Sequence, residues 1–335
     1  MGICKNKSER VEWIDCAKGI GIILVIMGHS ICPDTLLYWL YTFHMPLFFF
    51  LSGLTFNFDK YYEFKSFAIN KIKSLLIPYA LLSLIYFVWK IVKFFLFGTE
   101  FGILGSLLGI VIQIRGGRFG AGIWFLPLLF VTEILLWCIL RVAKKNLKKV
   151  VIIASGLLIC GYMYARYINV KLPWGLDAAL ISNFFMSIGF CSKNLITKKV
   201  NILGIFFIIP NILLGFLNSA LYETRVDIWA NNYGSLILYV LAALSGIYFC
   251  IAVSTKIKIS LLNYIGRYSV YYYGLHIIIV EFMTKVLTKF IDTKTIANQY
   301  ISLVVTFFCV IIGLNIMPEK MSNIIKKYTD KIANP

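Results

Sequence analysis

The chain has 335 residues, of which 60% are hydrophobic and only 14% are charged, and its mean hydropathy is +0.82. This composition excludes the ordinary soluble class, in which charged residues are far more frequent. The formal net charge of +18 suits either nucleic-acid binding or basic loops beside a membrane. The composition predicts an integral membrane protein. The positions of Lys and Arg along the chain decide between the two explanations of the net charge.

Apolar stretches of about 20 residues, the length that crosses a bilayer as a helix, recur from Gly19 almost to the C-terminus. They predict an all-α bundle of about ten transmembrane helices in a single domain, 1–335, with a membrane part of about 15–318. The shorter apolar run 101–114 predicts a re-entrant or interfacial segment. The predicted spans are 17–33, 36–56, 75–97, 122–141, 150–168, 176–192, 201–218, 234–254, 261–285 and 298–317.

The Lys and Arg residues are distributed unevenly between the two sides of this predicted bundle. With the N-terminus placed inside, 23 of the 33 lie on the cytoplasmic side and 10 on the other. The dense basic runs within 141–149 and 193–199 both fall in cytoplasmic loops, as the positive-inside bias requires. The even number of spans also places the tail 319–335 in the cytoplasm. Topology therefore explains the net charge, and we expect the lipid bilayer and no nucleic acid as a partner.

The first predicted helix contains three ionisable groups, Asp15, Lys18 and His29. Lys18 and His29 are eleven residues apart, which is about three turns and ~16 Å of rise, so they share a face, and Asp15 lies one turn before Lys18. Ionisable groups inside a bilayer cost ~2.5–3.5 kcal/mol each and indicate a partner or a function. A simple interfacial Asp15–Lys18 pair with a snorkelling Lys18 is the alternative, but it leaves His29 unexplained.

All three histidines of the protein fall inside predicted spans. In the second helix the spacing places Tyr41, His44, Phe48 and Ser52 along one side. In the ninth helix a second set can face one way: Ser269, Tyr272, Tyr273 and His276. Tyrosines near a helix end are also typical of an interfacial belt.

The remaining polar segments are loops on the outer side, near 98–121 and 219–233. They suit either the mouth of a site for a polar substrate or merely solvated loops. The eight cysteines form no CxxC or other ligand-like pair, so no metal site is expected.

The run from Ile14 to His29 resembles the opening signature of the acyltransferase-3 family, a basic residue followed by ten residues and a histidine. Within this family the chain looks like the fucose 4-O-acetylase-like branch, and the resemblance covers nearly the whole chain. Further matches follow in order: Phe43–Pro46 through Ser52–Gly53, Leu76–Tyr79, Trp124–Leu126 and Gly266–His276.

The chain departs from the family pattern at two kinds of position. The family usually has Arg where Lys18 stands, and often an Arg-x-x-Arg pair where Lys71 and Lys73 stand. Lysine keeps the charge but lacks the planar fork that grips phosphate. The Trp-Ser-Leu-x-x-Glu pattern of some relatives is also missing, because Leu129 takes the place of the acid and Glu133 comes one turn later.

The resemblance implies an O-acetyltransferase that moves an acetyl or other acyl group from acetyl-CoA to a hydroxyl of a cell-envelope glycan or lipid-linked sugar. It implies a multi-pass protein of the plasma (inner) membrane of a bacterium, with no permanently bound cofactor. His29 would be the catalytic base, since imidazole titrates near neutral pH, with Asp15 and Lys18 as catalytic partners. The expected contacts with donor or acceptor are His44, Ser52, Lys71, Lys73, Tyr79, Trp124, Ser269 and His276.

Two other classes of protein remain open. A transporter or exporter would use Asp15, Lys18 and His29 as a substrate or proton site, although the chain lacks the internal repeat of the common transporter plans. A membrane scaffold without catalytic activity would leave the three histidines unexplained.

Overall fold

A computed structural model describes residues 11–116, 123–199, 201–315 and 319–323 of the chain, and in this part every regular element is a helix. Nine helices of the described part are long and apolar enough to cross a membrane. The first helix, α1 (Glu12–His29), has 18 residues and corresponds to the first predicted span, 17–33. It is not among the nine because it has three charged side chains, Glu12, Asp15 and Lys18. The prediction of an all-α membrane bundle is confirmed.

The helices that follow α1 have these bounds in chain order: α2 (Asp34–Leu40), α3 (His44–Thr55), α4 (Phe64–Lys71), the π-helix η1 (Ile72–Leu76), α5 (Ile77–Phe97), α6 (Ile103–Ile112), α7 (Phe125–Val142), α8 (Leu147–Tyr167), the 3-10 helix η3 (Pro173–Gly175), α9 (Leu176–Cys191), α10 (Lys193–Lys199), the 3-10 helix η4 (Ile202–Phe207), α11 (Ile208–Tyr222), α12 (Leu236–Ser254), α13 (Ser260–Arg267), α14 (Ser269–Phe290) and α15 (Ile296–Leu314).

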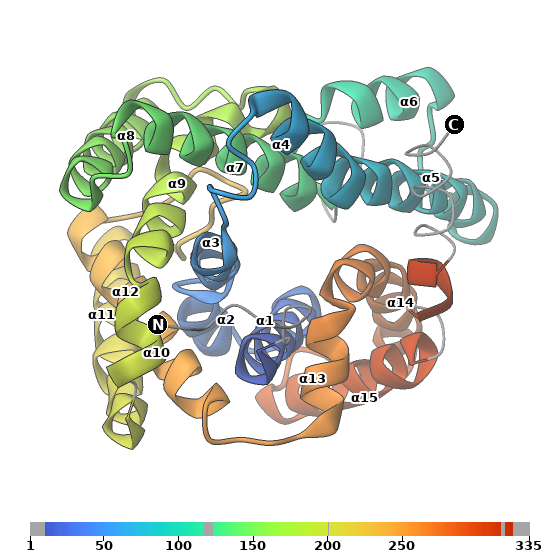
Figure 1. Ribbon diagram of the computed structural model, residues 1–335. Helices are drawn as coiled ribbons and strands as arrows, with labels where there is room; N and C mark the ends of the chain where they lie inside the picture. Colours follow the sequence, from blue (N-terminus) through green and yellow to red (C-terminus); the bar gives the residue numbers. More distant parts are fainter. Residues whose placement is uncertain (1–10, 117–122, 200, 316–318, 324–335) are drawn as a thin grey trace.

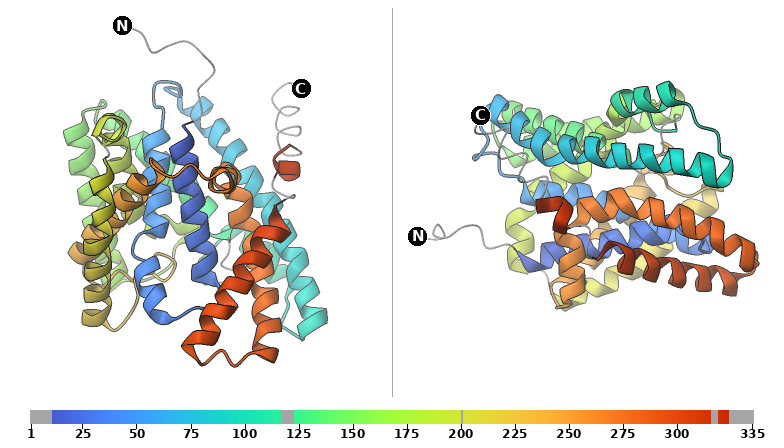
Figure 2. Two further views of the ribbon diagram at one scale, coloured as in Figure 1. Left: turned by 90° about the horizontal axis from the view of Figure 1, so that it is seen from below. Right: turned by 90° about the vertical axis from the view of Figure 1, so that its right-hand side faces the viewer.

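In Figure 1, α1 and α3 lie near the middle of the molecule, with α8–α12 on one side and α13–α15 on the other. Figure 2 shows that most of the long helices run alongside one another, as in a membrane bundle. The short apolar helix α6 has only ten residues, too few to cross a bilayer, and it lies at the end of the bundle where α1 finishes. We call the two ends of the bundle the Glu12 end and the His29 end.

Breaks divide several of the predicted spans. The predicted span 36–56 is two helices, α2 and α3, and the buried turn between them is held by Asn211 of α11, whose amide donates to Thr42 Oγ1 at 3.1 Å. The π-helix η1 lies just before Pro78, which has no N–H to donate to the carbonyl of Ser74. The predicted span 261–285 is also two helices, because Tyr268 leaves the helical conformation between α13 and α14.

Glycine residues allow two helix pairs to approach closely. A methyl group on Gly189 of α9 would overlap the carbonyl oxygen of Phe50 in α3, and one on Gly53 of α3 would overlap the carbonyl oxygen of Met186 in α9. Between α1 and α13, a methyl group on Gly266 would likewise overlap the carbonyl oxygen of Asp15. Small residues at such crossings let backbones pack together without a hydrophobic driving force.

Gly189→Ala is therefore expected to destabilise the bundle by about 1–3 kcal/mol, because the methyl group forces α3 and α9 apart. The midpoint of thermal unfolding in detergent measures this loss. The matched control is Gly156→Ala in α8, where the added methyl group meets nothing within 4 Å. Equal midpoints for the two variants would contradict the close α3–α9 contact.

Candidate active site

Two of the cavities in the described part of the chain share Met45 and Tyr273 as lining residues, so they are neighbours on either side of these side chains. We call them the basic cavity and the histidine cavity. The basic cavity, of about 230 Å³, is lined by Lys18, Ile22, Met45, Phe48, Ser52, Thr55, Lys71, Leu75, Phe125, Leu126, Leu129, Glu133, Ser269, Val270 and Tyr273. The histidine cavity, of about 280 Å³, is lined by Val25, Gly28, His29, Tyr41, His44, Met45, Trp124, Arg225, Asp227, Ile228, Trp229 and Tyr273.

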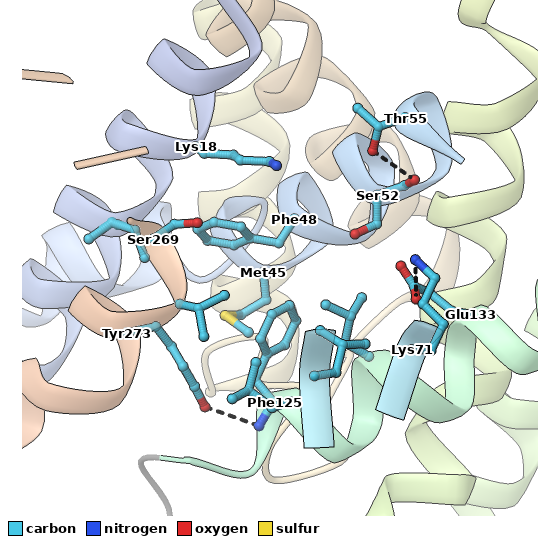
Figure 3. Close-up of a pocket in the computed structure, with 15 residues that line it drawn as sticks. Lys18, Met45, Phe48, Ser52, Thr55, Lys71, Phe125, Glu133, Ser269 and Tyr273 are labelled. Carbon is cyan, nitrogen blue, oxygen red and sulfur yellow. Dashed lines mark hydrogen bonds and ion pairs between the residues drawn. The ribbon is translucent and has the colours of Figure 1, made fainter. Parts of the chain in front are cut away.

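The basic cavity has two ammonium groups and one carboxylate on its walls. Figure 3 shows Lys18 of α1 reaching in from one side, with Lys71 and Glu133 on the opposite side. Lys71 Nζ lies 2.8 Å from Glu133 Oε2, and Glu133 of α7 is only 4% exposed. The hydroxyl-bearing residues Ser52 and Ser269 line the same space. Lys18 and Lys71 give the walls of this cavity a basic character.

The histidine cavity begins where α1 ends, because His29 is the last residue of that helix. The side chain of His29 is exposed to the cavity, and His44 of α3 lines it as well. The ring of His276 in α14 lies next to His29, with 5.2 Å between the ring centres. The fold thus brings all three histidines together from three helices.

Hydrogen bonds to the backbone decide which ring nitrogen has the proton in two of these histidines. Nδ1 of His44 lies 2.7 Å from the carbonyl oxygen of Leu40, and Nδ1 of His276 lies 2.7 Å from that of Tyr273. A carbonyl oxygen only accepts, so Nδ1 must donate in both rings. In a neutral ring Nε2 is then an acceptor, and a neutral His276 has no second N–H for a substrate oxygen.

The loop between α11 and α12, residues 223–235, lines the histidine cavity with four of its residues, among them Arg225 and Asp227. The Arg225 guanidinium lies over the ring of Tyr41 at 4.2 Å, and its Nη2 is 3.4 Å from Asp227 Oδ2. Asp227 also accepts a hydrogen bond from the N–H of Trp229 at 2.9 Å. Burial raises the pKa of the Asp227 carboxyl, and Arg225 opposes this shift.

A buried ion pair fixes the loop 223–235 to the rest of the bundle. Arg115, which follows α6, is 2% exposed and forms an ion pair with Asp177 of α9, with 2.5 Å between Nη2 and Oδ2. Its guanidinium also donates to Asn231 Oδ1 at 2.7 Å and to the carbonyl oxygen of Trp229 at 3.1 Å. Arg115 therefore helps to hold the loop that lines the histidine cavity.

Most of the residues that the sequence singled out line one of the two cavities. The basic cavity has Lys18, Ser52, Lys71 and Ser269, and the histidine cavity has His29, His44 and Trp124. Four lie elsewhere, and one of them is His276, which lines neither cavity but lies next to His29. Asp15 lines a separate cavity with Asn263 and Arg267, and Lys73 lines neither of the two cavities. The Tyr79 hydroxyl donates to the carbonyl oxygen of Ile110 at 2.5 Å. The functional roles of all these residues stay predictions.

The structure adds residues that the sequence analysis did not place in the site. Glu133 pairs with Lys71, and its position inside a predicted span was a signal that it needs a cationic partner. Arg225, Asp227 and Trp229 come from a loop whose polarity was evident but whose position was not. Tyr273 was one of several tyrosines with similar spacing, so no pattern distinguished it.

A bundle of apolar helices that encloses a basic cavity and an adjoining histidine cavity defines a membrane protein with a polar site in its interior. The family profile described as "Acyltransferase domain", of the acyltransferase-3 type, matches residues 11–316. The chain belongs to this family and is a multi-pass membrane acyltransferase. No curated protein and no solved structure matches it. Family membership does not favour the transporter alternative.

Proposed function

We propose that the chain transfers an acetyl group from acetyl-CoA to a hydroxyl group of a cell-envelope glycan or lipid-linked sugar, in the plasma (inner) membrane of a bacterium. The observation that supports this most directly is that a cavity lined by Lys18 and Lys71 adjoins a cavity lined by His29. Two substrates entering from the two cavities would meet near Met45 and Tyr273. This arrangement suits a group transfer between an anionic donor and a neutral acceptor.

The donor would occupy the basic cavity. Coenzyme A has several phosphate charges, and Lys18 and Lys71 are the cations on the cavity walls. The cavity volume of about 230 Å³ is below the ~300–1,000 Å³ of pockets that enclose drug-sized ligands, so the acetyl-pantetheine arm alone would enter. The nucleotide would stay at the Glu12 end of the bundle, where Lys71 lies.

The acceptor would occupy the histidine cavity. Its walls combine aromatic rings with charged groups, the combination that suits a sugar, because a sugar has apolar ring faces and a rim of hydroxyl groups. The aromatic side chains are Tyr41, Trp124 and Trp229, and the charged ones are Arg225 and Asp227. A hydroxyl held against these groups would lie next to His29.

In the proposed reaction His29 takes the proton of the acceptor hydroxyl while its oxygen attacks the thioester carbonyl. The new C–O bond gives a tetrahedral intermediate, which breaks its C–S bond, and the imidazolium returns the proton to the departing thiolate. The negative charge on the thioester oxygen requires a hydrogen-bond donor. Tyr273 suits this role, because its oxygen accepts the N–H of Phe125 at 3.0 Å and its O–H can point into the cavities that it lines.

The decisive test is transfer of radiolabel from acetyl-CoA to glycan or lipid-linked sugar acceptors by the purified protein in lipid vesicles. We expect labelled O-acetyl ester that is released by mild base. Mass spectrometry of envelope glycans from cells with and without the gene identifies the natural acceptor. Absence of transfer from every acyl donor, together with protein-dependent movement of a small solute, would overturn the proposal and favour a transporter.

Lys71→Met is expected to raise the KM for acetyl-CoA by about 10-fold or more, since a charge-assisted hydrogen bond contributes ~1.5–3 kcal/mol. The matched control is Lys73→Met, which removes a cation of the same segment that lines neither cavity. Because Lys71→Met alone leaves Glu133 unpaired, the double variant with Glu133→Gln is measured beside it. An equal KM in the Lys71 and Lys73 variants would exclude Lys71 from the donor site.

A further inference from the structure

We propose that His276 positions His29: Nε2 of His276 accepts a hydrogen bond from one ring nitrogen of His29, so that the other nitrogen of His29 faces the histidine cavity as the base. The catalytic consequence of this contact rests on the proposed function, but the contact itself does not. Four observations support it, namely the tautomer of His276, its unpaired nitrogen, the spacing of the rings and the freedom of the His29 side chain.

The backbone of α14 fixes the tautomer of His276. Nδ1 lies 2.7 Å from the carbonyl oxygen of Tyr273 and 3.1 Å from that of Tyr272, one turn earlier in the same helix. Both partners only accept, so Nδ1 has the proton and the lone pair of a neutral ring is on Nε2. The helix thus presents His276 to its neighbours as an acceptor.

This acceptor has no hydrogen-bond partner among the described residues. The side chain of His276 is 0% exposed, so bulk water does not reach it. Leaving a buried polar atom unpaired costs about 1–3 kcal/mol, and buried polar groups in proteins are nearly always paired. A donor close to Nε2 of His276 is therefore strongly favoured.

His29 is suitably placed to supply that donor. The centres of the two rings are 5.2 Å apart and the ring planes are tilted by 48°. Two imidazoles joined by one hydrogen bond of about 2.9 Å have ring centres roughly 5 Å apart, so the observed spacing requires rotation of the ring but no movement of either helix. His29 ends α1 and is exposed to the cavity, which leaves room for that rotation.

The proposed contact would determine which nitrogen of His29 acts as the base. A neutral imidazole without a fixed partner distributes its proton between two nitrogens, and only one of them can face the acceptor hydroxyl. Donation to Nε2 of His276 selects the productive tautomer and orients the ring, as a backbone or carboxylate acceptor does for many functional histidines. His276 would then act through His29 without touching either substrate.

The alternative role for His276 is simple packing in the core, and matched substitutions separate the two roles. His276→Met removes the acceptor while keeping a side chain of similar length, and His276→Gln keeps an acceptor near the position of Nε2. If His276 only packs, both variants behave alike. If it positions His29, the Met variant loses function and the Gln variant recovers most of it.

The first measurement is the rate at which diethyl pyrocarbonate modifies His29, followed by mass spectrometry on the folded protein without substrates. A ring whose N–H donates to an acceptor has a more nucleophilic second nitrogen, so we expect His276→Met to slow modification several-fold and His276→Gln to restore it. His44, which lines the same cavity, is the internal control for access of the reagent. An unchanged rate at His29 in the Met variant overturns the proposal, as does an equal change at His44.

The second measurement separates kcat from KM in the acetyl-transfer assay. We expect His276→Met to lower kcat by about 10- to 100-fold with little change in either KM, as for other groups that orient a functional histidine. If wild type transfers no acetyl group but the modification rates differ as expected, the proposed function fails and the His29–His276 contact stands. If transfer needs His29 while His276→Met matches wild type in both measurements, only the contact is disproved.

Discussion

His29→Ala is expected to lower kcat for acetyl transfer by about 10²- to 10⁴-fold, which is the usual contribution of a general base. The imidazole lies at the end of α1 and faces the cavity proposed for the acceptor, so its loss removes the group that would take the hydroxyl proton. Folding should be unaffected, because the side chain is exposed to the cavity. The measurement is kcat in the radiolabel assay, with gel filtration in detergent to confirm folding.

The control for His29 is His44→Ala, which removes the other imidazole that lines the same cavity. We expect it to raise the KM for the acceptor more than it lowers kcat, because a binding group contributes equally to ground state and transition state. Transfer by His29→Ala within a few-fold of wild type would exclude His29 as the base. A larger kcat loss in His44→Ala would transfer that role to His44.

Arg115→Met is expected to give the largest loss of stability, about 3–5 kcal/mol, because it leaves the Asp177 carboxylate buried without its cation. The same change frees the loop 223–235, so the KM for the acceptor should rise as well. The midpoint of thermal unfolding in detergent and the acceptor KM measure the two effects.

The matched control for Arg115→Met is Lys145→Met, which breaks the exposed ion pair with Asp59 at the Glu12 end. Exposed pairs contribute only about 0–1 kcal/mol, so its unfolding midpoint should stay close to that of wild type. Similar midpoints for the two variants would show that the Arg115 pair is not a buried structural contact. A lower midpoint with an unchanged acceptor KM would show that the loop does not need Arg115 to keep its place in the cavity wall.

Sequence patterns were sufficient for the class of fold, because the bilayer imposes a length and an apolar composition on every spanning helix. Nine of the ten predicted spans correspond to apolar helices of spanning length, and α1 adds the tenth despite its charged residues. The patterns could not locate the breaks between α2 and α3 or at Tyr268. Those breaks depend on tertiary contacts such as that of Asn211, and hydrophobic periodicity contains no signal for them.

Sequence patterns likewise predicted only part of the candidate site. Helical spacing placed Lys18 and His29 on one face of α1, and in the structure both face the interior, but in two different cavities. The spacing also placed Asp15 on that face, whereas the structure directs Asp15 toward α13. Periodicity predicts which residues share a face, and the neighbouring helix decides what each of them meets.

The sequence by itself determined that this protein crosses a membrane many times, that its first helix contains an unusual set of ionisable groups, and that it resembles the acyltransferase-3 family, a resemblance confirmed over residues 11–316. Only the tertiary structure decided that His29 lies beside His276 and that Lys71 pairs with Glu133. These pairs join helices far apart in the chain. Their contact depends on how these helices pack against one another, which the periodicity of a single helix cannot specify.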